Sequence, residues 1–330
     1  MPEKKSVVIN GKAPSLAAAE GKVYMAFASG DSIFYCVSAD KGKKFSVPSL
    51  AVVLPKLGVG GGRGPQIISV KDQLLIAASD NAGNIFSFTK KKNTTGWQKG
   101  GKINDVPEIA KEGFVSLASN NNGDVYAVWL DLRNDKKNKI VGAKSQDGGR
   151  TWSKNKIIYK SPDSNVCECC KPSVAMKGQL VVVMFRNWLN GNRDLHVIQS
   201  NDGGVNFGKA QKLGEGNWKL NGCPMDGGGL AINKNGEIQT VWRRQSKIYS
   251  ATIGSPEKEI GEGRSCTLET LNSKNIYAWT ENGEVVIIKP GGQKKILGKG
   301  SQPVLKALNN DHVICVWENE EQIHASILEL

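Results

Sequence analysis

The chain has 330 residues, of which 39% are hydrophobic, and its formal net charge is +13. This apolar content is sufficient for a buried core, but no apolar run approaches the roughly 20 residues that a membrane-spanning helix needs. The positive charge comes from 36 Lys and 8 Arg against 31 acidic residues. The lysines are scattered along the chain and belong to no nucleic-acid-binding motif. The composition therefore indicates a globular protein without a membrane span or a nucleic-acid partner.

The first ten residues, MPEKKSVVIN, contain no apolar stretch typical of a signal peptide. Two localisations stay open on this evidence. One is the cytoplasm, and the other is export to the periplasm or the extracellular space of a protein whose signal peptide lies outside this sequence.

From the N-terminus onwards the chain repeats one unit, in which apolar strands alternate with polar turns. The first strands of successive units begin near Pro14, Pro65, Val115, Pro172, Gly229, Thr267 and Pro303. Each is followed by a strand with alternating apolar residues, such as VYMAFAS, VYAVWLD or HVICVW. Almost nothing predicts a helix. Repeats of about 37 to 58 residues with four strands each predict an all-β fold, a β-propeller that forms one domain over residues 1–330.

The repeats number seven, and the last one is incomplete. It ends in QIHASILEL without an outer strand, which the N-terminal segment SVVIN (Ser6–Asn10) can supply. We therefore expect seven four-stranded blades, closed into a ring by the N-terminal strand. A six-bladed ring with one irregular excursion is the alternative.

Three octapeptides share the pattern Ser-x-Asp-x-Gly-x-x-aromatic: SADKGKKF (38–45), SQDGGRTW (145–152) and SNDGGVNF (200–207). The Asp carboxylate can accept backbone N–H groups across a tight turn, and Gly can adopt the positive φ that such a turn needs. The aromatic ring, three residues on, covers the turn. The pattern therefore predicts structural turns organised by Asp40, Asp147 and Asp202, not chemistry.

These octapeptides resemble the Asp-box (BNR) repeats of the sialidase-like β-propellers, and through its repeats the resemblance covers nearly the whole chain. It implies that ligands bind on the face opposite the Asp-box turns, around the mouth of the central channel. The expected function is to bind or act on an acidic glycan or another anionic small molecule, as a monomer. Sialidases have six blades, so seven would be a departure from that family.

The sialidase resemblance also implies three arginines on the sugar carboxylate, a Tyr–Glu nucleophile pair and an Asp acid. The Phe-Arg-Ile-Pro motif of the first sialidase arginine is absent, and we map no Tyr to a loop on the ligand face. The catalytic trio is therefore not assigned. Whether the protein is an enzyme such as a glycoside hydrolase stays open, and so do the candidate acid–base residues Asp131, Asp194 and Asp226.

Seven of the eight arginines map to the loops or strand ends of the predicted ligand face. Arginine offers a planar fork that binds carboxylate, sulfate or phosphate through two hydrogen bonds. One interpretation is an anion-binding funnel; the other is that the arginines pair with Asp131, Asp135 and Asp194 and stiffen the loops. The predicted ligand set, with a neighbouring amide and indole, is Arg63, Arg133, Arg186, Asn187, Trp188, Arg193, Arg243, Arg244 and Arg264.

Five cysteines map to loops that enter three consecutive blades on the same face: Cys167, Cys169, Cys170, Cys223 and Cys266. Three interpretations stay open. Cys223 can form a disulfide with one member of the CECC cluster. Alternatively, Cys167, Cys170 and Cys223 bind copper or zinc with Met225, or the thiols are free. The alternative function of the protein is therefore metal- or thiol-dependent, centred on this cysteine-rich rim.

Overall fold

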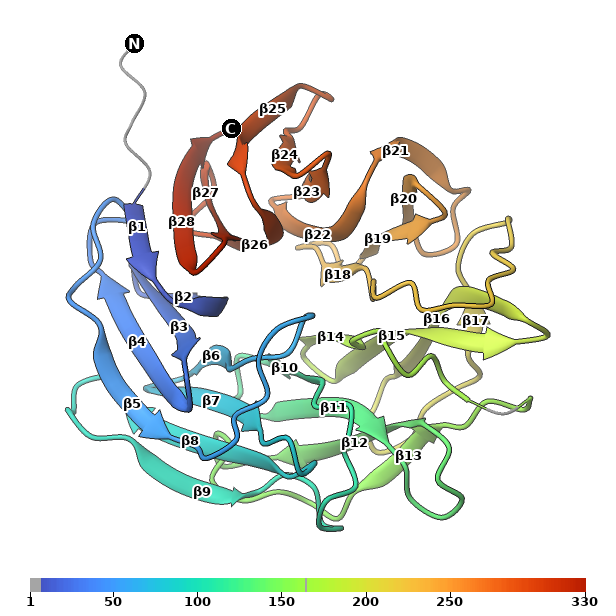
Figure 1. Cartoon of the computed structure of the whole chain (residues 1–330), viewed down its shortest axis with the longest axis horizontal. Coiled ribbons are helices and arrows are strands. Elements are labelled where there is room, and N and C mark those ends of the chain that lie inside the picture. The colour runs from blue at the N-terminus through green and yellow to red at the C-terminus, as the bar shows by residue number, and fades with distance from the viewer. Residues whose placement is uncertain (1–6, 164) are drawn as a thin grey trace.

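The computed structural model describes residues 7–163 and 165–330, which form 28 strands and no helix. The strands make seven four-stranded antiparallel sheets arranged in a ring (Figure 1). An all-β propeller of seven blades was expected from the repeats and is confirmed. Among the described residues there is accordingly no helix able to cross a membrane.

The first four blades follow one another along the chain. Their strands are β2 (Lys12–Ala19), β3 (Lys22–Ser29), β4 (Ser32–Ser38) and β5 (Ser49–Val53); β6 (Gln66–Val70), β7 (Gln73–Ser79), β8 (Ile85–Lys91) and β9 (Gln98–Lys102); β10 (Val115–Ser119), β11 (Val125–Asp131), β12 (Lys139–Ser145) and β13 (Lys156–Tyr159); and β14 (Ser173–Lys177), β15 (Leu180–Leu189), β16 (Asn192–Ser200) and β17 (Gln211–Lys212).

The remaining three blades use the rest of the chain together with its first strand. Their strands are β18 (Gly229–Ile232), β19 (Ile238–Arg244), β20 (Lys247–Thr252) and β21 (Lys258–Glu262); β22 (Arg264–Leu271), β23 (Lys274–Glu281), β24 (Glu284–Ile288) and β25 (Lys294–Lys299); and β26 (Ser301–Ala307), β27 (His312–Asn319), β28 (Gln322–Glu329) and β1 (Val7–Asn10).

The ring is closed by pairing between the two ends of the chain. Strand β1 pairs antiparallel with β28, so that Val8 lies opposite His324 and Ile9 opposite Ile323 (blue and red in Figure 1). The predicted closure by the N-terminal strand is therefore confirmed for Val7–Asn10, while Ser6 lies outside the described residues. One sheet thus contains strands from opposite ends of the chain.

The core lies between neighbouring blades, because each sheet packs one face against the preceding blade and the other face against the following blade. The second strand of a blade carries the largest buried side chains: Trp129, Trp279 and Trp317 are all 2% exposed or less. These strands combine β-branched and aromatic residues, which pack well on a pleated surface. The innermost strands β2, β6, β10, β14, β18, β22 and β26 surround the central channel.

The three Asp boxes share one hydrogen-bond pattern, seen most fully in the box of the third blade. Ser145 Oγ donates to Asp147 Oδ1 over 2.8 Å and accepts Gly149 N–H over 2.8 Å. Asp147 Oδ1 also accepts the N–H groups of Arg150 and Thr151, at 3.0 and 2.9 Å. The equivalent bonds of Asp40 and Asp202 reach the N–H groups four residues on. In each box, the Asp carboxylate accepts hydrogen bonds from backbone N–H groups of the turn.

Each box also packs against the preceding blade. Phe207 lies 5.8 Å from the Tyr126 ring of β11, measured between ring centroids, and Trp152 Nε1 donates to Ser87 Oγ of β8 over 3.2 Å. Gly204 has a φ of +87° and lies so close to the Tyr126 ring that a Cβ would meet its Cε2 at 2.0 Å. The boxes therefore join adjacent sheets at the face opposite the interblade loops.

Candidate functional site

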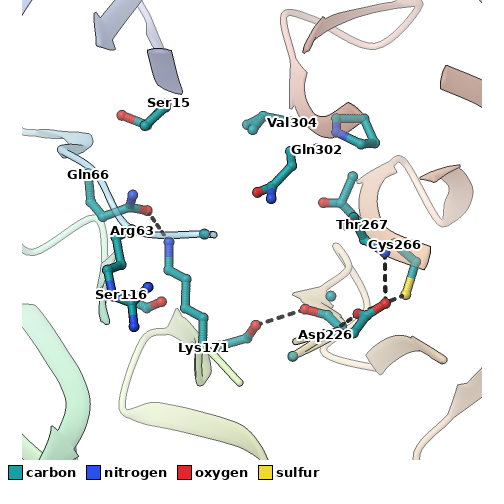
Figure 2. A pocket seen from close by; sticks show the side chains of 18 of the residues that line it. Ser15, Arg63, Gln66, Ser116, Lys171, Asp226, Cys266, Thr267, Gln302 and Val304 are labelled. Carbon is teal, nitrogen blue, oxygen red and sulfur yellow. Dashed lines mark hydrogen bonds between the residues drawn. The ribbon is translucent and has the colours of Figure 1, made fainter. Parts of the chain in front are cut away.

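A cavity of about 340 Å³ occupies the mouth of the central channel. All seven innermost strands contribute to it, mostly at their first residues, and so do the loops before β6 and β18. Figure 2 shows Lys171, Arg63, Gln66 and Ser116 on one side of this cavity, with Asp226 and Cys266 across from them. Gln302 of β26 completes the polar lining.

Lys171 precedes β14 by two residues and extends along the cavity wall toward Gln66. Its Nζ donates to Gln66 Oε1 over 2.7 Å, and it forms no ion pair with any described residue. Burial lowers the pKa of Lys171 to about 8, because the charged ammonium loses solvation without gaining an anionic partner. The cavity therefore contains a cation at neutral pH whose only hydrogen-bond acceptor in the described part of the chain is neutral.

Arg63 lies beside Lys171 in the loop between β5 and β6. Its Nε donates to the backbone oxygen of Glu112 over 2.6 Å, and its guanidinium carbon lies 4.6 Å above the Phe114 ring. The Glu112 carboxylate is 3.9 Å from Nη2, at the limit of an ion pair. The terminal nitrogens of Arg63 thus remain largely available on the cavity side.

Asp226 faces the two basic residues from the loop before β18. Its Oδ2 accepts Ser265 N–H over 2.7 Å, and its Oδ1 accepts Gly228 N–H over 3.3 Å. Burial raises the pKa of Asp226, although Arg186 and these two hydrogen bonds oppose the shift. Glu318, which also lines the cavity, accepts Ala13 N–H over 3.0 Å, and burial raises its pKa too. Two carboxyl groups here retain protons more readily than ordinary ones.

Most of the predicted arginines are occupied by partners within the protein. Arg186 is 1% exposed and donates from Nε, Nη1 and Nη2 to the backbone oxygens of Asp226, Arg193 and Arg243. It lies inside β15, and Arg193 lies inside β16, whereas the sequence placed both beside a loop. The hairpin is tighter than expected because the strand pairing continues to Leu189 and Asn192.

The other arginines of the predicted set do not converge. Arg133 pairs with Asp131 and Asp105, and Arg244 pairs with Glu257. Arg243 donates to Gln245 O and Pro224 O, and the exposed Arg264 begins β22. Trp188 stacks under Arg193, and Asn187 donates to Tyr159 Oη over 2.9 Å. Arg63 is the member of the predicted set that lines the central cavity.

Asp131 and Asp194 lie away from the cavity and hold structural contacts. Asp131 accepts the indole N–H of Trp129 and two donors of Arg133. Asp194 accepts Trp218 N–H over 2.8 Å. Of the three carboxylates named from the sequence, Asp226 lines the cavity.

The cysteine-rich rim joins the loops that enter the fourth and fifth blades. Cys169 and Cys223 form a disulfide with a Cα–Cα distance of 6.1 Å. The free thiols of Cys167 and Cys170 are buried beside it, with their sulfurs 3.3 Å apart. Cys266 lies within β22, not in the preceding loop, and its sulfur is 4.0 Å from Asp226 Oδ1.

The sequence-based metal set does not fit this oxidised state. The sulfurs of Cys167, Cys169 and Cys170 lie within 4.8 Å of one another, which is compatible with a soft metal such as copper or zinc. Cys169 and Cys223 are bonded to each other, however, and Met225 is 56% exposed. Cys223 of the predicted metal set is therefore unavailable as a thiolate ligand, as is the neighbouring Cys169.

Sequence reasoning did not assign Lys171, Gln66, Gln302 or Glu318 to the site. The signal that could have found the first three is their position, because each lies within two residues of the start of an innermost strand. Glu318 lies near the end of β27 and lines the cavity because β27 pairs with the innermost strand β26. No local sequence pattern predicts this position.

Comparisons with known proteins agree with this architecture. The BNR repeat-like domain family matches residues 21–258. A protein of unknown function from Dyadobacter fermentans DSM 18053 is 14% identical, with a TM-score of 0.61, and the match covers 99% of this chain and 98% of that one. No curated protein matches.

Two further solved structures share the fold. A polysaccharide lyase named as a PL25 ulvan lyase is 11% identical with a TM-score of 0.62, over 98% of this chain and 94% of its own. A sialidase named Hadza microbial sialidase Hz136 is 14% identical with a TM-score of 0.59, over 97% and 66% of the two chains. At these identities the likeness is one of fold.

Proposed function

Because this chain belongs to the BNR repeat-like domain family, we propose that its central cavity binds the anionic group of an acidic saccharide. The observation that carries the proposal is Lys171, an ammonium group in the cavity wall that has a neutral hydrogen-bond acceptor and no ion-pair partner among the described residues. A bound carboxylate or sulfate would supply the missing counter-charge. The proposed anion site thus uses Arg63 of the predicted arginine set together with Lys171.

Electrostatics support an anion in this position. A charged group with lost solvation and no opposite charge is costly, so a ligand anion at Nζ recovers part of that cost. Arg63 adds terminal N–H donors beside Lys171, and Gln302 adds an amide. Charge-assisted hydrogen bonds of this kind are about twice as strong as neutral ones.

Size and chemistry favour a saccharide unit over a long polymer. The cavity volume of about 340 Å³ is at the lower end of the range for small-molecule sites, about 300–1,000 Å³. The named activities of two structural neighbours, a polysaccharide lyase and a sialidase, concern saccharides, which motivates the choice of ligand class. Asp226 faces the basic residues with a raised pKa and is the residue suited to donate a proton if the bound sugar is cleaved.

Calorimetric titration of the full chain with uronic acids, sialic acid and sulfated monosaccharides tests the proposal. We expect at least one of these ligands to bind and its neutral analogue to bind at least tenfold more weakly. Lys171→Gln should reduce the affinity about 10- to 100-fold, the usual loss for a charge-assisted hydrogen bond. Lys209→Gln is the matched control, because Lys209 is exposed and follows an Asp box on the opposite face.

The same titration has a defined pH dependence. Since the pKa of Lys171 is lowered to about 8, the ammonium is lost as pH rises through that value while the ligand stays ionised. Affinity should therefore fall between pH 7 and pH 9 in the wild type, and this fall should be absent in Lys171→Gln. No binding by any acidic sugar, or equal binding by both lysine variants, would contradict the proposal.

A further inference from the structure

We propose that the cysteine-rich rim is a thiol–disulfide exchange site, in which Cys167 attacks the sulfur of Cys169 and releases Cys223. The inference is independent of saccharide binding. It assigns an activity to two buried thiols and one disulfide that the proposed saccharide site does not use.

The geometry places nucleophile, target and leaving group together. Cys167 Sγ lies 3.7 Å from Cys169 Sγ, which is one of the two sulfurs of the Cys169–Cys223 disulfide. Cys167 and Cys170 are fully buried, whereas Cys223 is exposed. An attack on Cys169 therefore needs no large movement, and it releases the sulfur that water can solvate.

The neighbours of Cys167 favour its thiolate, which is the reactive form. The hydrogen bond between the sulfurs of Cys167 and Cys170, 3.3 Å apart, and the nearby Arg193 and Arg186 guanidinium groups lower the pKa of Cys167 to about 7 against the opposing effect of burial. Arg193 Nη1 also donates to Cys167 Sγ over 3.1 Å. Glu168 faces the same group through its ion pair with Arg193, at 3.0 Å, and partly balances this charge.

The first step transfers one bond and needs no added oxidant. The Cys167 thiolate forms an S–S bond with Cys169, the Cys169–Cys223 bond breaks, and its electron pair leaves on Cys223 as a thiolate. The number of disulfides and the total charge are unchanged. The product has a Cys167–Cys169 bond and an exposed, nucleophilic Cys223 in the loop before β18.

A second step is available through Cys170. Its sulfur lies 3.3 Å from Cys167 Sγ, so that after losing its proton it can attack Cys167 and release Cys169. The proton lost by Cys170 is taken up by Cys169 or by the Cys223 thiolate. Burial and the nearby Cys167 raise the pKa of Cys170, so this step should be slower than the first.

The exchange has a structural consequence. The Cys169–Cys223 bond ties the segment before β14 to the segment before β18, and both segments line the central cavity. Exchange removes the covalent link between these two segments and leaves Cys223 able to form mixed disulfides with small disulfide compounds.

Alkylation of the native, unreduced protein with N-ethylmaleimide, followed by peptide mapping without reductant, tests the proposal. We expect label on Cys223 together with a Cys167–Cys169 or Cys167–Cys170 disulfide. The labelling rate should rise about fivefold between pH 6 and pH 7 and level off above pH 8, as a thiol with a pKa of about 7 ionises.

Three variants separate the steps. Cys167→Ser should leave Cys169–Cys223 intact and Cys223 unlabelled. Cys170→Ser retains a hydroxyl group that can hydrogen-bond with Cys167, and exchange in this variant should stop at the Cys167–Cys169 bond. Cys36→Ser is the control, because burial raises the pKa of this distant thiol to about 12 and it should not affect the exchange.

Two results would overturn the proposal: a wild-type map that keeps Cys169–Cys223 with Cys223 unlabelled, or equal labelling of Cys223 in Cys167→Ser. Circular dichroism checks that each variant folds. If Cys167→Ser does not fold, the wild-type map and its pH profile decide the question alone.

Discussion

Arg186 and Lys171 are both positively charged, but they differ in how many of their donors are already bonded within the protein. All three donor nitrogens of Arg186 bond to backbone oxygens from different parts of the chain, so this arginine fixes the segments that meet near the cavity. Lys171 bonds to a single amide oxygen and faces the open cavity. Lys171 is available for a ligand because it has no ion-pair partner among the described residues. A cation that has lost solvation without gaining an opposite charge is costly, so binding an anion is favourable.

Asp147 illustrates a polar residue whose role is structural. Asp147→Ala should destabilise the protein by about 1–3 kcal/mol, because the N–H groups of Arg150 and Thr151 lose their acceptor in a half-buried turn. Chemical denaturation measures this change, and Lys209→Gln provides a surface control in the same architecture. Unchanged stability combined with lost saccharide binding would contradict the structural role.

The same turn gives a pH dependence. Burial raises the pKa of Asp147, but hydrogen bonds from Thr151, Ser145 and Arg150 outweigh it, and the net pKa is lowered. The stabilisation by Asp147 is therefore complete above the ordinary aspartate pKa and is lost as pH falls through the lowered value. The stability difference between wild type and Asp147→Ala should shrink on acidification below about pH 4.

At the scale of elements, the segments that enter successive innermost strands are packed backbone against backbone. Gly227, just before β18, lies against the residue that precedes β14: a Cβ at this position would meet the backbone oxygen of Lys171 at 1.9 Å. Backbone atoms cannot move aside as a side chain does. Gly227 thereby allows the segment before β18 to pack directly against the backbone of Lys171.

Gly227→Ala should therefore destabilise the protein by more than an ordinary surface change, by about 2–4 kcal/mol. Gly222→Ala is a matched control in the same loop, since its nearest neighbour would be 3.6 Å away and its change should stay within about 0.5 kcal/mol. Thermal and chemical unfolding of the two variants measure the difference. Equal stability of both would mean that the close backbone approach does not constrain the loop.

At the scale of the whole molecule, the seventh blade depends on the N-terminal strand. Gly11 N–H donates to Glu321 O over 2.8 Å, and alternation along β1 directs the N–H of Ile9 toward β28 as well. The N–H of Val8 then faces away from the sheet. This difference allows closure of the ring to be tested with a single residue type.

Ile9→Pro should lower stability by about 1–3 kcal/mol, because proline removes the N–H that pairs with β28. Val8→Pro is the matched control and should have a much smaller effect, since its N–H has no partner in the sheet and Val8 is 46% exposed. Differential scanning calorimetry compares the two. A larger effect of Val8→Pro would indicate that β1 pairs with a different register.

Much of the ring could be predicted from the sequence because each blade repeats local signals. Strand alternation and the recurring turn residues located all seven innermost strands, and the missing outer strand of the last unit pointed to Val7–Asn10. The site was less predictable. The sequence pattern placed seven arginines on one face of the propeller. It could not show that the donors of Arg186 bond to three backbone oxygens, or that Lys171 has no ion-pair partner among the described residues. Those facts depend on contacts between distant segments.

The pairing of β1 with β28 also sets an order of events during synthesis. Strand β1 leaves the ribosome before any other strand described here, yet the strand it pairs with is the last one made. Until then the hydrogen-bonding edge of β1 stays unpaired, and the face of the first blade that packs against the seventh stays uncovered. Chain closure over such a separation is slow, and open edges invite pairing with other chains. A nascent chain of this protein should therefore be most prone to aggregate just before its final strand appears, and binding by a chaperone should be most useful at that moment.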